Sequence, residues 1–112
     1  FDDSEYSIRL NNEGNIYCIP SSIMHHDVGN DRRSSWKDYY DTRNWIDLVK
    51  VHYSYPLLVS AVIKMYLKRV SILAKIARNR SKEHRIMCKE AIKDGISGNL
   101  GINSKYKPGK DI

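Results

Sequence analysis

The sequence contains no long hydrophobic run. Its longest apolar stretch, from Tyr55 to Ile63, is interrupted by Pro56 and Ser60 and ends at Lys64. A membrane-spanning helix needs about 20 consecutive, predominantly apolar residues. No segment of this sequence therefore qualifies as a transmembrane helix.

Several common catalytic and binding motifs are also missing. The chain has no Cys-x-x-Cys, no glycine-rich loop for dinucleotides or phosphates and no Gly-x-Ser-x-Gly, so the chemistries that depend on them find no support. Its two cysteines, Cys18 and Cys88, lack the spacing of metal ligands. We expect two free, partly buried thiols rather than a disulfide.

Charge is distributed unevenly along the 112 residues, whose formal net charge is +6. Residues 1–31 hold six acidic residues and one basic residue, a net charge of −5. Residues 64–93 hold ten basic and two acidic residues, a net charge of +8. An acidic front and a basic back indicate two different tasks.

Apolar periodicity predicts helices over most of the chain. The first is a short helix over 2–10, with Glu5 and Arg9 as partners one turn apart and Gly14 as a left-handed cap. Three longer helices follow, from Trp36 to a break at Ser54, from about Pro56 to Arg78, and from about Lys82, capped by Ser81, to Asp94, with Gly95 ending it. The second of these carries one stripe at helical spacing, formed by Leu57, Leu58, Ala61, Val62, Met65, Tyr66, Arg69, Ile72, Leu73 and Ile76.

Residues 15–19 predict a short strand that ends at Pro20. A single strand cannot satisfy its own backbone hydrogen bonds. The sheet must therefore come from residues ahead of Phe1 or from another chain, or it does not exist. Because the chain also starts at Phe1, directly before a dense acidic motif, we expect the back part of a longer protein.

Three carboxylates gather at the front of the chain, on Asp2, Asp3 and Glu5. Two adjacent carboxylates at a helix start can bind a divalent cation, or one can act as a general base that the helix dipole keeps ionised. Acidic residues are also favoured in a first helical turn for structural reasons. The cluster alone does not decide between these roles.

A second cluster, Met24-His25-His26-Asp27, combines imidazole with carboxylate. Adjacent side chains in an extended loop point to opposite sides, so His25 and His26 are not expected to bind one metal together. His25 with Asp27, or His26 alone, is the geometry that suits Mn²⁺, Zn²⁺ or Fe²⁺. A solvent-exposed histidine pair is the structural alternative.

Asp-Asp-x-Glu-Tyr-x-x-Arg at 2–9 is followed by the histidine loop and by Trp-x-x-Tyr-Tyr-x-x-Arg-Asn at 36–44. The order of these motifs resembles the carboxyl-terminal part of family 2 glycosyltransferases. The most similar branch is the bacterial rhamnosyl- and galactofuranosyltransferase-like group, which builds cell-surface polysaccharides. Residues 93–101, Lys-Asp-Gly-Ile-Ser-Gly-Asn-Leu-Gly, resemble the end region of the family more loosely.

The resemblance implies an inverting transferase that uses a nucleotide-sugar donor, a glycan or lipid-linked acceptor, and Mn²⁺ or Mg²⁺. Asp3 then matches the catalytic base, and Asp2 lines the acceptor pocket. His25 matches the histidine that helps to hold the metal, with His26 as the substitute if the loop is shifted by one residue. Such an enzyme is cytoplasmic, with a peripheral place on the inner face of the cell membrane.

The fold class that follows is mainly α: the helical end of a GT-A α/β glycosyltransferase with one short strand, lacking the sheet and the nucleotide-binding half. Residues 1–35 are the acceptor-side end of the catalytic domain, residues 36–95 the carboxyl-terminal helices, and residues 96–112 a glycine-rich tail. Arg43 is expected to brace a loop. The family's Asp-x-Asp metal motif is absent, so we expect the chain alone to be inactive.

The basic segment is expected to meet an anionic membrane surface. Its candidate residues are Lys64, Lys68, Arg69, Lys75 and Arg78. A solvated helix face is the structural alternative. Nucleic acid is not expected, because aromatic residues are few in this segment and no recognition motif appears.

Two other functions stay open on the sequence alone. One is a non-catalytic basic helical module that binds an anionic membrane or a protein partner. The other is a small metal-binding protein that uses His25, His26 and Asp27. Self-association is a further expectation, because an orphaned strand and exposed apolar faces favour it.

Overall fold

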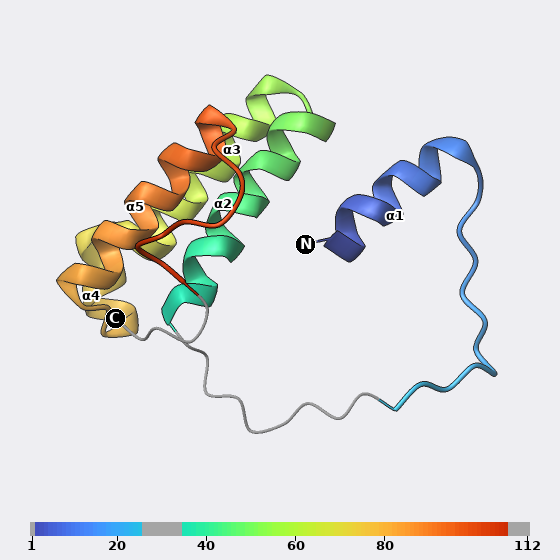
Figure 1. Cartoon of the computed structure of the whole chain (residues 1–112), viewed down its shortest axis with the longest axis horizontal. Helices are drawn as coiled ribbons and strands as arrows, with labels where there is room; N and C mark the ends of the chain where they lie inside the picture. The colour runs from blue at the N-terminus through green and yellow to red at the C-terminus, as the bar shows by residue number, and fades with distance from the viewer. Residues whose placement is uncertain (1, 26–34, 108–112) are drawn as a thin grey trace. The chain divides into compact units, whose positions relative to one another are not determined.

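The computed structural model describes residues 2–25 and 35–107. The chain divides into two compact units, Phe1–Arg33 and Ser34–Ile112. The described residues are mainly helical and include no β-strand (Figure 1). The mainly α prediction is therefore confirmed. None of the described helices is long and apolar enough to cross a membrane.

The first unit contains helix α1 (Asp2–Glu13), which runs three residues beyond its predicted end. Arg9 Nε lies 2.8 Å from Glu5 Oε1, so the predicted pairing one turn apart is confirmed. The prediction of a left-handed Gly14 is wrong, because positive φ occurs among the described glycines only at Gly98 and Gly101. The Gly14 N–H instead donates to Leu10 O at 3.0 Å, which continues the helical pattern.

The predicted strand over 15–19 is also wrong. These residues are irregular, and the side chains of Ile16, Tyr17 and Ile19 are exposed. No other segment that the structure describes pairs with them. A short apolar segment of this kind becomes a strand only where a neighbouring strand takes up the backbone hydrogen bonds.

The second unit is a helical bundle. Its elements are α2 (Ser35–His52), α3 (Tyr55–Met65), the π-helical turn η1 (Tyr66–Val70), α4 (Ile72–Arg78) and α5 (Lys82–Ser97). Helices α2 and α5 lie side by side, and α3 packs against α2 (Figure 1). The main cluster of buried side chains comprises Tyr39, Val70, Met87, Cys88, Ala91, Ile92 and Tyr106.

The segment predicted as one helix over 56–78 is broken into three elements. The Ser71 N–H donates to Tyr66 O at 3.0 Å, which closes the wide turn of η1, and Ser71 itself is extended. Arg85 Nε donates to the Val70 carbonyl at 2.6 Å, so a side chain from α5 takes up an acceptor that the break leaves free. The π turn is a single wide turn between two α-helices, and its last two residues, Arg69 and Val70, are buried.

Helix α5 begins as predicted but ends later. The Ser81 hydroxyl accepts a hydrogen bond from the His84 N–H at 3.1 Å, which confirms the predicted cap. The predicted end at Gly95 is wrong, because the helix continues to Ser97 and Gly98 takes the left-handed cap position with φ +69°. Gly95 is buried where α5 touches α2, and a Cβ there would lie 2.6 Å from the Arg43 carbonyl oxygen. Close packing, rather than a helix stop, is the role of this glycine.

We expect Gly95→Ala to lower the free energy of unfolding of the 112-residue chain by about 1–3 kcal/mol, the usual effect of overpacking. The backbone of α2 is the obstacle, and it cannot move aside as a flexible side chain can. Urea unfolding followed by circular dichroism measures the change. Ser97→Ala, at the exposed end of the same helix, should change the value by less than about 0.5 kcal/mol. A Gly95→Ala chain as stable as the wild type would contradict this explanation.

The segment after α5 packs back onto the bundle. Residues 98–107 are irregular, as predicted for the glycine-rich tail, but Tyr106 is fully buried. Its ring lies 4.6 Å from that of Tyr39, centroid to centroid. Tyr106 Oη also donates to Glu90 Oε2 at 2.5 Å. This part of the tail is therefore held against α2 and α5.

Candidate functional site

The acidic front of the chain starts α1. Asp2 is the first residue of the helix, and Asp3 follows with an exposed side chain. No described residue donates a hydrogen bond to the Asp3 carboxylate or forms an ion pair with it. The Asp3 carboxylate is thus exposed and has no partner among the described residues.

His25 is the one predicted metal ligand that the structure describes. It is exposed and lies in irregular chain that follows the turn at Pro20 and Ser21. Its predicted companions, His26 and Asp27, lie outside the described residues. In the ranges 2–25 and 35–107, no three His, Cys, Asp or Glu side chains come close enough together to hold a metal ion. The described ranges therefore do not form a metal site by themselves.

The two segments of the second unit that carry the family resemblance, residues 36–44 and 93–101, are joined by side chains. Tyr39 Oη donates to Asp94 Oδ2 at 2.6 Å, and Arg43 Nη1 donates to Gly101 O at 2.6 Å. Burial and the hydrogen bond to Asp94 raise the pKa of Tyr39, so its hydroxyl stays protonated and remains a donor. We call this set of contacts the α2–tail brace.

Further contacts of Asn103, Tyr40 and Arg43 belong to the α2–tail brace. Asn103 donates to both tyrosines of the motif, from Nδ2 to Tyr39 Oη at 2.9 Å and from its backbone N–H to Tyr40 Oη at 3.1 Å. The guanidinium of Arg43 lies 4.8 Å from the centre of the Tyr40 ring and also donates to Asn44 Oδ1. The prediction that Arg43 braces a loop is confirmed. Tyr39 and Tyr40, the two tyrosines of the motif, therefore hold the tail in place through Asn103.

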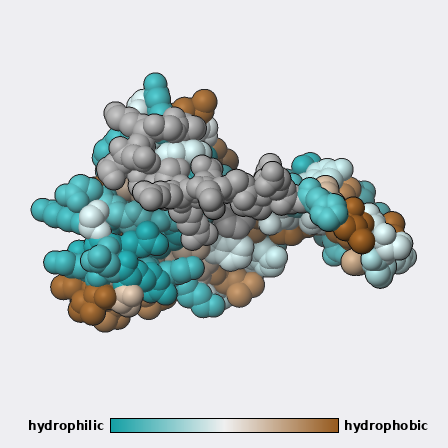
Figure 2. Space-filling view, turned by 90° about the horizontal axis from the view of Figure 1, so that it is seen from below, coloured by the Kyte–Doolittle hydropathy of each residue, from teal (hydrophilic) through white to brown (hydrophobic). Residues whose placement is uncertain are grey.

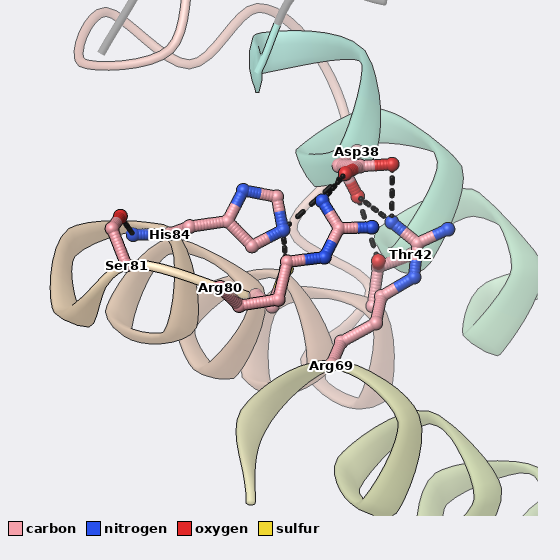
Figure 3. A network of polar contacts seen from close by, with 7 residues as sticks. Asp38, Thr42, Arg69, Arg80, Ser81 and His84 are labelled. Atoms are coloured by element: carbon pink, nitrogen blue, oxygen red, sulfur yellow. Dashed lines mark hydrogen bonds and ion pairs between the residues drawn. The ribbon is translucent and has the colours of Figure 1, made fainter. Parts of the chain in front are cut away.

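A buried ion cluster is centred on Asp38 of α2 and was missed by the sequence patterns (Figure 3). Asp38 Oδ1 lies 2.7 Å from Arg69 Nη1, and Asp38 Oδ2 lies 2.9 Å from Arg80 Nη1 and 3.3 Å from His84 Nε2. The side chains of Asp38 and Arg69 are each only 8% exposed. Thr42 closes the turn by donating to the Asp38 carbonyl at 2.6 Å. Three separate elements, α2, η1 and α5, therefore meet at one carboxylate.

The charges in this cluster depend on one another. Burial by itself raises the pKa of Asp38, but the ion pairs with Arg69 and Arg80 outweigh it and hold that pKa below its usual value. Burial, followed by repulsion from Arg80, lowers the pKa of His84. At neutral pH the cluster therefore contains one carboxylate, two guanidinium groups and a neutral imidazole.

Arg69 does not belong with the predicted membrane-binding residues. Arg69 is buried against Asp38 and does not reach an outer surface, so its assignment to an anionic membrane surface is wrong. The stripe predicted over 57–76 is not one core-facing surface, because Ala61 is buried whereas Leu57, Tyr66, Ile72, Leu73 and Ile76 are exposed. The place of Arg69 in this stripe therefore did not reveal its burial. The other four residues, Lys64, Lys68, Lys75 and Arg78, are exposed.

The two cysteines are free, as predicted. Cys88 is fully buried beside His84, with Sγ 3.5 Å from Nε2, and burial raises the pKa of its thiol. A protonated, buried thiol is a packing group and not a nucleophile. Cys18 is exposed rather than partly buried.

Comparison with known proteins adds no support to the family resemblance, which rests only on the sequence motifs. No protein-family model, no curated protein and no solved structure matches this chain.

Proposed function

We propose that the chain is the carboxyl-terminal part of an inverting family 2 glycosyltransferase with a GT-A catalytic domain. The observation that carries the proposal is the α2–tail brace. The segments 36–44 and 93–101 resemble the family independently, 49 residues apart along the chain, and they contact each other through Tyr39–Asp94 and Arg43–Gly101. Motifs that jointly define a family are expected to meet in its fold.

In this proposal Asp3 is the general base. Its carboxylate takes the proton from an acceptor hydroxyl, the acceptor oxygen bonds to the anomeric carbon of the donor sugar, and the nucleoside diphosphate leaves from the opposite side. The anomeric configuration is inverted by this single displacement. Asp2 lies beside Asp3 in sequence and lines the acceptor pocket. His25 would contribute one ligand to Mn²⁺ or Mg²⁺, and the bound ion would neutralise charge on the leaving diphosphate.

The proposal is tested with the intact protein. Its reading frame should extend about two hundred residues ahead of Phe1, since a domain of roughly that size is needed to bind the donor, and should contain an Asp-x-Asp. The intact protein, given Mn²⁺ or Mg²⁺ and nucleotide-activated rhamnose or galactofuranose, should release nucleoside diphosphate and glycosylate a lipid-linked or oligosaccharide acceptor.

The isolated 112 residues should show no transfer under the same conditions, because the described residues provide no donor-binding loop and no complete metal site. Nucleoside diphosphate release by the isolated chain at the rate of the intact protein would contradict the proposal. So would a gene that starts at Phe1.

A further inference from the structure

A second functional surface lies on α3, η1 and α4, and it is apolar. The side chains of Ile72 and Ile76 are 66% and 77% exposed, and those of Leu57 and Ile63 are each 52% exposed. The residues of the same elements that pack against the bundle are smaller, and Ala61, Val70 and Ala74 are buried there. The larger apolar residues therefore remain outside, where exposure to water is unfavourable by about 25 cal/mol per Å².

Figure 2 shows where such side chains gather. Brown, hydrophobic side chains stand at the left end of the helical unit, where α4 lies in Figure 1, and teal, hydrophilic side chains border them. In the sequence of α4, Ile72, Leu73 and Ile76 share one helical face and are all exposed, Lys75 flanks that face, and Arg78 is exposed at the end of the helix. Apolar and cationic groups are thus next to each other on one short helix.

All the charged side chains of this apolar surface are cationic. Between Leu48 and Lys82 the sequence has no Asp or Glu. Lys64, Lys68, Lys75 and Arg78 are exposed, and none of them pairs with a carboxylate of a described residue. The other two arginines of this stretch, Arg69 and Arg80, are already paired with Asp38.

An apolar groove extends the same surface towards α2. It has a volume of about 210 Å³ and lies between Trp45, Val49 and Tyr53 on one side and Leu57 and Ala61 on the other, and Lys64 also lines it. A groove of this kind accommodates several methylene groups of an acyl chain.

We propose that the exposed face of α3, η1 and α4 docks onto the surface of a lipid bilayer with anionic headgroups. Large aliphatic side chains enter the boundary between headgroups and acyl chains, and lysines extend their ammonium groups to the phosphates. A protein partner fits less well, because lysine is depleted in protein–protein interfaces. Nucleic acid fits less well, because it offers nothing to exposed isoleucine and leucine. This inference goes beyond the proposed function and does not depend on transferase activity.

Co-sedimentation of the 112-residue chain with vesicles tests the proposal. The chain should bind vesicles of an equal mixture of phosphatidylcholine and phosphatidylglycerol much better than vesicles of phosphatidylcholine alone. Each lysine near an anionic surface contributes roughly a fivefold gain in affinity. The variant K68Q/K75Q should therefore bind the mixed vesicles about 30-fold more weakly. Its matched control, K89Q/K93Q on exposed positions of α5, removes the same charge and should lose much less.

The apolar part of the surface is tested by I72S/I76S, which should weaken binding at least about tenfold. Circular dichroism and urea unfolding show whether the variants keep the wild-type fold. The wild-type chain gives a second measurement that needs no variant, since hydrogen exchange should slow in α3 and α4, and not in α5, when mixed vesicles are added.

Several outcomes would overturn the proposal. The chain could fail to bind the mixed vesicles, or K68Q/K75Q and K89Q/K93Q could lose the same affinity for them. Hydrogen exchange could slow in α5 instead of α3 and α4. The chain could also form a dimer that I72S/I76S dissociates, without binding lipid. The last result would assign the surface to a second copy of the chain.

Discussion

Asp3→Asn in the intact protein is expected to lower kcat by about 10³-fold, within the range that a positioned general base contributes. Asn has the shape of Asp but cannot accept the proton of the acceptor hydroxyl. The donor does not contact this group before reaction, so the Kd of the donor should stay nearly unchanged. Stopped-time assays of nucleoside diphosphate release and a fluorescence titration of the donor measure the two quantities separately.

Glu5→Gln is the matched control for this experiment. It removes one carboxylate from the same exposed helix, where Glu5 pairs with Arg9. The kcat of this variant should stay within a factor of about two, because an exposed pair of this kind is worth less than 1 kcal/mol. If Asp3→Asn keeps the wild-type kcat, Asp3 is not the base; if both variants lose activity equally, the effect comes from α1 and not from proton transfer.

Local signals in the sequence predicted much of the helical structure. Ser81 was identified as a cap from its place before a periodic segment, and its hydroxyl accepts the His84 N–H. Tyr39, Tyr40, Arg43, Ile46 and Val49 stand at helical spacing and lie on the predicted helix, where all of them except the half-buried Tyr40 are buried. These features depend on residues within one or two turns, so the sequence alone contains the information that determines them.

The features that were missed depend on residues far apart in the chain. The π turn at 66–70 buries Arg69, which pairs with Asp38 31 residues earlier and could not be identified from the periodicity of 56–78. A glycine near the end of a helix usually marks its end, but Gly95 lies inside α5, where the Arg43 carbonyl oxygen leaves no room for a Cβ. In both cases a tertiary contact overrides the local preference.

The candidate site shows the same division. The bracing role of Arg43 was predicted, because an arginine among packed aromatic residues rarely remains free for substrate, and the partner it holds, Gly101 O, became visible only in the fold. The charged stripe of residues 64–78 separates into one buried arginine and four exposed cations. Periodicity places a residue on a face, but the partner of that face decides whether the charge is buried or free.

Asp38→Ala is expected to lower the free energy of unfolding of the 112-residue chain by about 3–5 kcal/mol, the usual effect of removing one partner of a buried ion pair. The substitution leaves the guanidinium of Arg69 buried without its carboxylate, and the Nε atoms of Arg69 and Arg80 already lack partners within the described structure. Urea unfolding measures the loss. Asp41→Ala, on the same helix and only partly buried, is the matched control and should change the value by less than about 1 kcal/mol.

The same cluster predicts a stability that falls in acid, in two steps. The pKa of His84 is lower in the folded chain than its usual value of 6.5, so the unfolded chain binds the extra proton first and stability decreases as the pH falls below about 6.5. The pKa of Asp38 is also lowered by folding, so its contribution is complete above the usual value of 3.8 and is lost as the pH falls through the folded pKa. Unfolding free energies measured from pH 8 to pH 3 in wild type, Asp38→Asn and His84→Gln separate the two steps. The first step should vanish in His84→Gln. The second should shrink in Asp38→Asn and keep the part that Glu90 contributes, because Lys105 and Tyr106 outweigh burial and lower the pKa of Glu90 as well. A wild-type profile that is flat over this range would show that Asp38 is not the ionised centre of the bundle.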